Sequence, residues 1–364
     1  MTQTSRRVHN FNPGPAVLPL EALERAREEF LDFAGTGMSV MEVSHRSPEF
    51  EALLNEAVAL LRELLEVPPN YKILFLQGGA SLQFAMVPMN FLQGASADYI
   101  VTGSWSEKAL KEAKLFGNPR VAFTSKETRY NRIPKQEELQ LDPAARYVHI
   151  TTNNTIYGTE WHYVPDVGSV PLVADMSSDM MWRKFDVTRY ALIYAGAQKN
   201  LGPSGVTVVI LREDLLAQCP ANLTSLLSYK THADNNSLYN TPPTFGIYML
   251  RNVLAWKKKV GGLAEIERRN REKARLIYDC IDRHPSLYRG HAEKDSRSVM
   301  NITFTLRSPE LEKRFLEEAK RRDLVGLKGH RSVGGCRASC YSALPLESAQ
   351  ALVDFMEEFA RANP

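Results

Sequence analysis

The sequence predicts an α/β fold with a mainly parallel sheet, followed by a smaller α+β domain. Between residues 72 and 211, short apolar runs alternate with helical segments. This alternation is typical of βαβ units, which build a parallel sheet covered on both faces. Beyond residue 298, one alternating strand and two amphipathic helices suit a small α+β unit. The length of 364 residues also favours more than one domain.

The first predicted elements are helices. After an extended arm at residues 11–16, residues 20–33 place Leu23, Ala26 and Phe30 at helical spacing. A second helix is predicted to begin at Ser47, with Pro48 in its first turn. Its apolar residues follow the i, i+3, i+4, i+7 rule of an amphipathic helix: Phe50, Leu53, Leu54, Ala57, Leu61, Leu64 and Leu65.

Six apolar runs are the predicted strands of the sheet: residues 73–76, 99–101, 147–150, 172–174, 191–194 and 206–211. Ligands of such sheets bind at the carboxyl ends of the strands. The residues that follow each run are therefore the first candidates for a functional site. The polar segment at residues 212–243 is predicted to be an irregular excursion, because it contains Asn235-Asn236 and Pro242-Pro243.

The C-terminal part is predicted from the same periodicities. Helices are expected at residues 245–259 and 263–284, and the break at Gly261-Gly262 suits a joint between domains. A strand at residues 298–306 and helices at residues 310–322 and 346–362 complete the chain. We expect an N-terminal arm at residues 1–19, a large domain at 20–258 and a small C-terminal domain at 259–364.

Composition argues against several functions. The 45 basic and 42 acidic residues give a net charge of +3, which is too small to predict a nucleic-acid surface. No secretion signal and no apolar segment of about 18 residues is present, so we expect no membrane association. The cysteines form no Cys-x-x-Cys pair, so we expect reduced thiols in a cytoplasmic protein and no bound metal, zinc included. They are Cys219, Cys280, Cys336 and Cys340.

Lys199 is the first candidate for catalysis. It follows an apolar run within the glycine-rich segment Ala197-Gln-Lys-Asn-Leu-Gly-Pro-Ser-Gly205, which would hold its amine in a pocket. A desolvated lysine near a cation has a lowered pKa and can form a Schiff base with a carbonyl or with pyridoxal phosphate. Asp175 ends another apolar run and offers the carboxylate that a pyridinium nitrogen needs. The alternative is a lysine that extends toward solvent and an aspartate that caps a turn.

Three further motifs also follow predicted strands. Gln77-Gly-Gly-Ala-Ser81 opens a helix, where backbone N–H groups and the Ser81 hydroxyl can face a phosphate. Trp105 can stack on a flat ring, and Thr155 can bond a ring substituent. Each has a structural alternative: a plain strand-to-helix turn, core packing, or a turn hydroxyl that bonds the backbone. The order of phosphate cup, aspartate and lysine along the chain favours a cofactor site.

Arginines indicate where an anionic substrate would bind. Arg46 lies in Ser44-His-Arg-Ser47, and Arg331 and Arg337 lie in the glycine-rich segment at residues 329–338. Guanidinium pairs carboxylate and phosphate through two hydrogen bonds, so these residues suit a small substrate with two or three negative charges. His45 and His330 adjoin them and are candidates as well. A single arginine can equally be a solvated surface group.

Together these motifs resemble the phosphoserine aminotransferase family, class-V fold-type-I pyridoxal-phosphate enzymes of serine biosynthesis. The resemblance covers nearly the whole chain. It implies a seven-stranded, mainly parallel sheet in the large domain and an N-terminal arm associated with the small domain. The motifs are Phe11-Asn-Pro-Gly-Pro15, Val43-Ser-His-Arg-Ser47, Gly103-Ser-Trp105, Asn153-Asn-Thr-Ile-Tyr-Gly158, Ala174-Asp-Met-Ser-Ser178, Ala197-Gln-Lys199, Tyr239-Asn-Thr-Pro-Pro243 and Gly329-His-Arg331.

The resemblance also implies roles for single residues. Lys199 would carry pyridoxal phosphate as a Schiff base, and Asp175 would pair the ring nitrogen. Trp105 would stack on the ring, and Thr155 would lie near the ring hydroxyl. Ala80, Ser81 and Gln198 would hold the cofactor phosphate together with the partner's Asn240 and the partner's Thr241, which implies a homodimer with shared active sites. Arg337 would bind the substrate α-carboxylate. The remaining substrate contacts would come from His330, Arg331, the partner's His45 and the partner's Arg46.

The implied reaction moves the amino group of L-glutamate to 3-phosphohydroxypyruvate, giving O-phospho-L-serine and 2-oxoglutarate. The pocket could also accept 3-hydroxy-2-oxo-4-phosphooxybutanoate of pyridoxine biosynthesis, because one added group is worth only about 1–3 kcal/mol of discrimination. One alternative is a cysteine desulfurase with Cys336 as nucleophile, and another is a catalytically silent scaffold that retains the cofactor. The chain departs from some members of the family at Ser81, where they carry Arg, and at Pro13, where they carry Ser.

Overall fold

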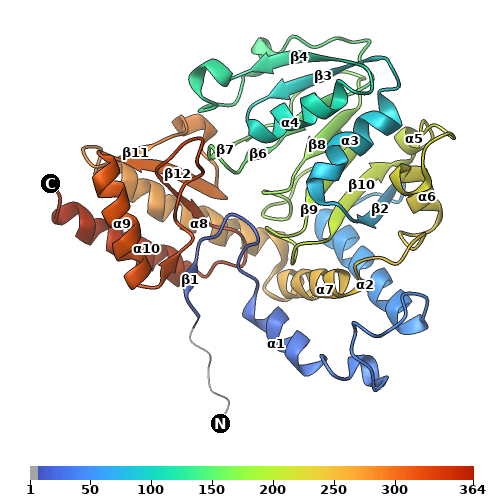
Figure 1. Ribbon diagram of the computed structural model, residues 1–364, viewed down its shortest axis with the longest axis horizontal. Helices are drawn as coiled ribbons and strands as arrows, with labels where there is room; N and C mark the ends of the chain where they lie inside the picture. The colour runs from blue at the N-terminus through green and yellow to red at the C-terminus, as the bar shows by residue number, and fades with distance from the viewer. Residues whose placement is uncertain (1–6) are drawn as a thin grey trace.

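A seven-stranded sheet forms the centre of the computed structural model, which describes residues 7–364 (Figure 1). β10 runs antiparallel to both of its neighbours, and the other neighbouring strands are parallel. The predicted α/β class with a mainly parallel sheet is therefore confirmed. In spatial order the strands are β2 (Tyr71–Leu76), β10 (Thr207–Arg212), β9 (Leu192–Gly196), β8 (Leu172–Asp175), β5 (Val148–Thr151), β3 (Ser96–Val101) and β4 (Asn118–Thr124).

The six predicted strands all occur in this sheet, and the edge strand β4 is an addition that the apolar pattern does not predict. β4 contains Pro119 and Arg120, and Ala122 is its one buried residue. An edge strand pairs on one side only and can carry proline and charged residues. β4 lacks an apolar run because most of its residues are exposed or only half-buried, whereas β2, the strand at the other edge, is almost entirely buried.

Alternate residues of the strands pack into two different cores. In β10, Val208 and Ile210 join one cluster, whereas Val209 and Leu211 join another. Successive side chains of a strand point to opposite faces of a sheet, so both faces are covered. The first core includes residues of α2 (Pro48–Leu65) and α7 (Thr244–Lys259), and the second includes residues of α3 (Gly79–Phe91) and α4 (Ser104–Ala113). Figure 1 shows α3 and α4 lying over the sheet.

The second predicted helix is α2, and its cap and apolar face are as expected. The Ser47 hydroxyl accepts a hydrogen bond from the Phe50 backbone N–H at 3.4 Å. All seven apolar residues named for this helix are buried. A capped helix with one continuous apolar face needs only a core to pack against.

The first helix is shorter than predicted. α1 spans Leu20–Glu28, so Phe30 lies beyond its end. Ala22 and Ala26 are the buried residues of the helix, while Leu23 is 36% and Phe30 39% exposed. The small alanines allow close packing on one side, and the large apolar side chains stay at the surface.

The C-terminal part packs around its own apolar core. α8 (Gly262–Arg283) and α10 (Leu346–Arg361) lie beside a sheet of order β11-β12-β14, and the core includes Phe304, Phe315 and Phe355. The sequence pattern predicts β12 (Asn301–Leu306) but neither β11 (Tyr288–Gly290) nor β14 (Cys336–Ser339), because neither of these two contains an apolar run. α9 (Pro309–Arg321) completes this part.

The N-terminal arm lies against the same C-terminal part. β1 (His9–Asn10) pairs in parallel with β13 (Leu324–Val325), and Phe11 joins the C-terminal core. Residues 1–6 of the predicted arm lie outside the described residues, and the predicted domain boundaries stay a prediction.

The smaller elements lie in connections. The excursion at residues 212–243, predicted to be irregular, holds two short helices. They are α5 (Glu213–Leu216) and α6 (Tyr229–Asp234), and a small hairpin elsewhere consists of β6 (Asn153–Asn154) and β7 (Thr159–Glu160). Within residues 7–364, no helix has both the length and the apolar content needed to cross a bilayer.

Candidate active site

A cavity of ≈ 320 Å³ lies where the carboxyl ends of several sheet strands meet the first turn of α3. Residues far apart in sequence reach it from the sheet, from the N-terminal arm and from β14. Nine of the predicted site residues line it: Ala80, Ser81, Trp105, Thr155, Asp175, Gln198, Lys199, His330 and Arg337.

Lys199 points its amine into this cavity. Lys199 Nζ donates a hydrogen bond of 2.8 Å to Thr155 Oγ1. The pKa of Lys199 is lowered to about 8, mainly by burial and also by the charge of Arg337, against the opposing charge of Asp175. A substantial fraction of the amine is therefore neutral near physiological pH, as a nucleophile or base requires.

Asp175 is the last residue of β8 and lies on the cavity wall. Its side chain is buried, and it accepts a hydrogen bond of 2.9 Å from the backbone N–H of Ser177. Burial raises the pKa of Asp175, against the Ser177 hydrogen bonds and the charge of Lys199. Burial disfavours the charged form of this carboxylate, so a cation that enters the cavity would stabilise that charged form.

The first turn of α3 forms a cradle of backbone N–H groups. Its N-cap is Gly78 with φ of 83°, and no side chain caps the helix. A Cβ atom at Gly78 would lie 2.6 Å from Leu82 Cβ, so only glycine fits this turn. Ala80 and Ser81 follow in the open first turn, where N–H groups and the helix dipole favour an anion such as phosphate.

Trp105 and Thr155 line the space next to these charged groups. Trp105 lies in the first turn of α4, and its buried Nε1 has no hydrogen-bond partner within residues 7–364. Its indole borders the cavity as the prediction of a ring-stacking residue requires. Thr155 bonds Lys199 through its hydroxyl and Arg337 through its carbonyl, so it joins two functional side chains.

Arg337 brings a second positive charge to the cavity. It lies in β14 and is 6% exposed, and its Nη1 donates to the Thr155 carbonyl at 3.1 Å. Burial lowers the pKa of Arg337. No carboxylate forms an ion pair with it among the described residues, and its Nε has no partner there. An unpaired, buried guanidinium on a cavity wall is suited to bind a carboxylate.

His330 lines the cavity, but five other predicted residues do not. His330 Nδ1 is 2.7 Å from Ser332 Oγ in the neighbouring loop. Arg331 is exposed next to it, and His45 and Arg46 lie just before α2. Asn240 and Thr241 belong to the polar excursion, where Gln77 Nε2 donates to the Thr241 carbonyl at 3.0 Å. The chain alone therefore does not bring these five to its own cavity.

Several cavity residues were absent from the sequence prediction. The motifs contained Asn153, Ser177 and Ser178 without assigning them a role, whereas Phe84 gave no signal beyond its helical position. Gly14 packs directly on the lysine: with φ of +131°, a Cβ there would lie 3.2 Å from Lys199 Cγ. The Asn-Pro-Gly-Pro arm could have indicated this close approach, because glycine often marks one.

The family model for class-V aminotransferases matches residues 8–352. The chain belongs to the class-V aminotransferase family. A phosphoserine aminotransferase of Lysinibacillus sphaericus is 58% identical over 360 residues, which cover 99% of each chain. The solved structure of phosphoserine aminotransferase from Bacillus circulans subsp. alkalophilus has a TM-score of 0.97 at 58% identity, covering 99% of this chain and 100% of that one. The PLP-bound phosphoserine aminotransferase from Trichomonas vaginalis has a TM-score of 0.92 at 38% identity, covering 96% and 100%.

This class-V aminotransferase uses pyridoxal phosphate, and the cavity fits that cofactor. Asp175 offers a buried carboxylate to a ring cation, and the uncapped first turn of α3 offers N–H donors to a phosphate. Lys199 lines the same cavity with an amine of lowered pKa. The desulfurase alternative fails at Cys336, whose side chain is fully buried in the C-terminal core and whose pKa is raised by that burial.

Proposed function

We propose that this aminotransferase is a phosphoserine aminotransferase of L-serine biosynthesis. It would transfer the amino group of L-glutamate reversibly to 3-phosphohydroxypyruvate, giving O-phospho-L-serine and 2-oxoglutarate. Full-length relatives of that name at 58% identity support the substrate pair. The observation that carries the proposal is the buried, unpaired guanidinium of Arg337 beside Lys199, because every substrate of this reaction has an α-carboxylate.

Four residues of the cavity have separate roles in the proposed reaction. Arg337 binds the α-carboxylate and orients the substrate α-carbon toward Lys199. The neutral amine of Lys199 takes a proton from the glutamate α-carbon and would pass it on to the bound cofactor in the same half-reaction. In the second half-reaction the amine would move a proton in the opposite direction, onto the α-carbon of the phosphorylated acid. Pyridoxal phosphate, when bound, supplies an electron sink for the negative charge at the α-carbon. Asp175 keeps the ring nitrogen protonated, and Thr155 fixes the lysine amine and the arginine fork in one geometry.

We also propose that the active site is completed in a homodimer. His45, Arg46, Asn240 and Thr241 do not line the cavity of their own chain. Large apolar side chains are exposed just before this His-Arg pair, namely Leu20, Leu23, Phe30, Leu31, Met38 and Met41. A partner that covers these side chains would carry its own His45 and Arg46 toward the neighbouring cavity.

Substrate breadth and location belong to the same proposal. An arginine fork accepts carboxylate and phosphate alike, since both present paired oxygens. The pocket could therefore bind glutamate in one half-reaction and a phosphorylated 2-oxo acid in the next. Action on the longer phosphorylated acid of pyridoxine biosynthesis, and a cytoplasmic location, stay predictions from the sequence.

The test is an absorbance titration of the purified holoenzyme. We expect L-glutamate to bleach the visible band of the bound cofactor, and 3-phosphohydroxypyruvate, but not pyruvate, to restore it. The longer phosphorylated acid is added in a parallel titration, and the two rates of return rank the substrates. A Lys199→Ala variant should not respond, whereas Lys184→Ala, which changes an exposed lysine, should respond like the parent. Equal return of the band with pyruvate would contradict phosphate selectivity.

A further inference from the structure

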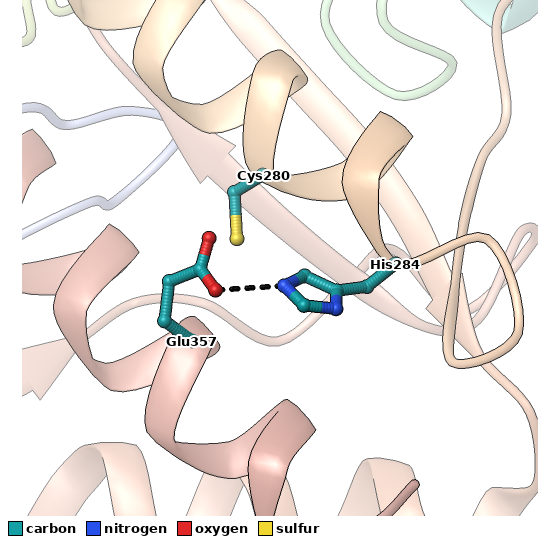
Figure 2. A group of neighbouring side chains, drawn as sticks. All are labelled: Cys280, His284 and Glu357. Atoms are coloured by element: carbon teal, nitrogen blue, oxygen red, sulfur yellow. Dashed lines mark hydrogen bonds and ion pairs between the residues drawn. The ribbon is translucent and has the colours of Figure 1, made fainter.

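We propose that Cys280, His284 and Glu357 form a binding site for one Zn²⁺ ion, separate from the active-site cavity. Their ligand atoms all lie within 4.8 Å of one another, and none of the three lines the cavity. Figure 2 shows the three side chains converging between α8 and α10. The site rests on these contacts and is independent of the aminotransferase substrate.

Helix geometry brings the three groups together. Cys280 lies in the last turns of α8 and His284 follows its final residue, four positions on, so both side chains share one face. Glu357 comes from α10, which packs along α8. His284 Nε2 lies 2.7 Å from Glu357 Oε2.

The donor set suits zinc better than other common ions. A thiolate, an imidazole and a carboxylate are the ligand types of Zn²⁺, whereas Mg²⁺ and Ca²⁺ prefer oxygen alone. Zinc bonds of about 2.0–2.3 Å at tetrahedral angles would separate the ligand atoms by roughly 3.3–3.6 Å. The present separations bracket that range, from 2.7 Å between nitrogen and oxygen to at most 4.8 Å across the group. Side-chain rotations that move the ligand atoms by about 1 Å would therefore bring them to tetrahedral zinc coordination.

The surroundings leave room for a fourth ligand and hold the carboxylate in place. The side chains of His284 and Glu357 are 28% and 27% exposed, so an ion and a water molecule can reach the group from solvent. Arg283 Nη2 donates to Glu357 Oε1 at 2.6 Å, which leaves Oε2 facing His284. Such an outer partner orients a ligating carboxylate.

Zinc binding must displace the proton of the Cys280 thiol. The Cys280 side chain is fully buried, and a thiol is ordinarily protonated at neutral pH. Binding then forms a zinc–sulfur bond and releases that proton to solvent, so the affinity should rise with pH. The expectation of no metal rested on the lack of a Cys-x-x-Cys pair, which says nothing about ligands that two separate helices contribute.

The experiment uses the holoenzyme and its variants, loaded with Zn²⁺ or Co²⁺ and then dialysed. We expect one retained zinc per chain, a thiolate-to-cobalt charge-transfer band with Co²⁺, and a zinc-dependent rise in melting temperature. Cys280→Ser and His284→Gln should each abolish the cobalt band and the thermal shift while leaving transaminase activity unchanged. Cys219→Ser and His291→Gln are the matched controls, since both lie outside the group.

The outcomes decide the proposal. A parent protein that retains no zinc, or a Cys280→Ser variant that binds as much as the parent, would overturn it. The three side chains would then be a hydrogen-bonded contact between α8 and α10 only. If Cys280→Ser fails to fold, His284→Gln, at a partly exposed position, carries the same test.

Discussion

Replacement of Arg337 by methionine tests the central assignment of the active site. The guanidinium has no ion pair among the described residues and is 6% exposed, so a bound α-carboxylate would be its one anionic partner. A hydrogen bond to a charged group contributes about 1.5–3 kcal/mol, and an arginine fork makes two. Arg337→Met should therefore lose about 3–6 kcal/mol of binding free energy for the α-carboxylate in the transition state, which corresponds to a fall in kcat/KM for glutamate of roughly 10²- to 10⁴-fold.

The assay is steady-state transamination with glutamate, combined with chemical unfolding of the same variants. Arg337→Lys keeps the charge but loses the fork, so its activity should lie between those of the parent and Arg337→Met. Arg289→Met, at an exposed position in β11, is the matched control and should behave like the parent. Arg337→Met should not lower the free energy of unfolding much, because it removes a buried charge that lacks an ion pair. Parent-like kcat/KM in Arg337→Met would refute the carboxylate assignment.

Three further predictions concern backbone, charge and assembly. Gly14→Ala should weaken cofactor binding, because the added methyl group would press on the Lys199 side chain. Gly168→Ala is the control: this glycine also has a positive φ but has open space around it, so the substitution should strain only the backbone. Titration with the cofactor compares the affinities of the two variants. Burial lowers the pKa of Lys273 to about 7, below its unfolded value of about 10.4, so the free energy of unfolding should rise from pH 7 to 10. Lys273→Met should reduce the slope of the free energy of unfolding against pH by the equivalent of about one proton, as measured by denaturant titrations at several pH values. An unchanged slope would contradict the lowered pKa of Lys273. Leu31→Asp should produce monomers with weakened cofactor binding in sedimentation and absorbance measurements, whereas Leu115→Asp should not; both positions are exposed.

Much of the fold could be predicted because burial leaves a local trace in the sequence. The apolar runs of β2, β5 and β8 mark strands buried on both faces, and α2 shows a complete apolar stripe with its serine cap. The edge strand β4 and the short strand β14 leave no such trace. Ala122 is the one buried residue of β4, and β14 reads Cys-Arg-Ala-Ser, so neither strand contains a run of large apolar residues.

In the candidate site too, some features could be predicted from the sequence and others could not. Lys199, Asp175 and the Gly78 turn could be predicted, because each follows a buried strand and the carboxyl ends of parallel strands meet at one edge. The close packing of Gly14 on Lys199 could not, because it depends on where the N-terminal arm folds back. Arg337 was named from its motif, but only the pairing of β14 with β12 turns its fork toward Thr155 and the thiol of Cys336 into the core.

The sequence by itself determined the fold class and the order of the chemical groups along the chain, and it named the lysine that the structure places in the cavity. The tertiary structure alone decided which charges share one cavity and which stay outside it. It also decided that Cys280 and His284 meet Glu357 from another helix. The physical reason is that periodicity records whether a residue is buried, whereas a contact between distant residues depends on how whole elements pack.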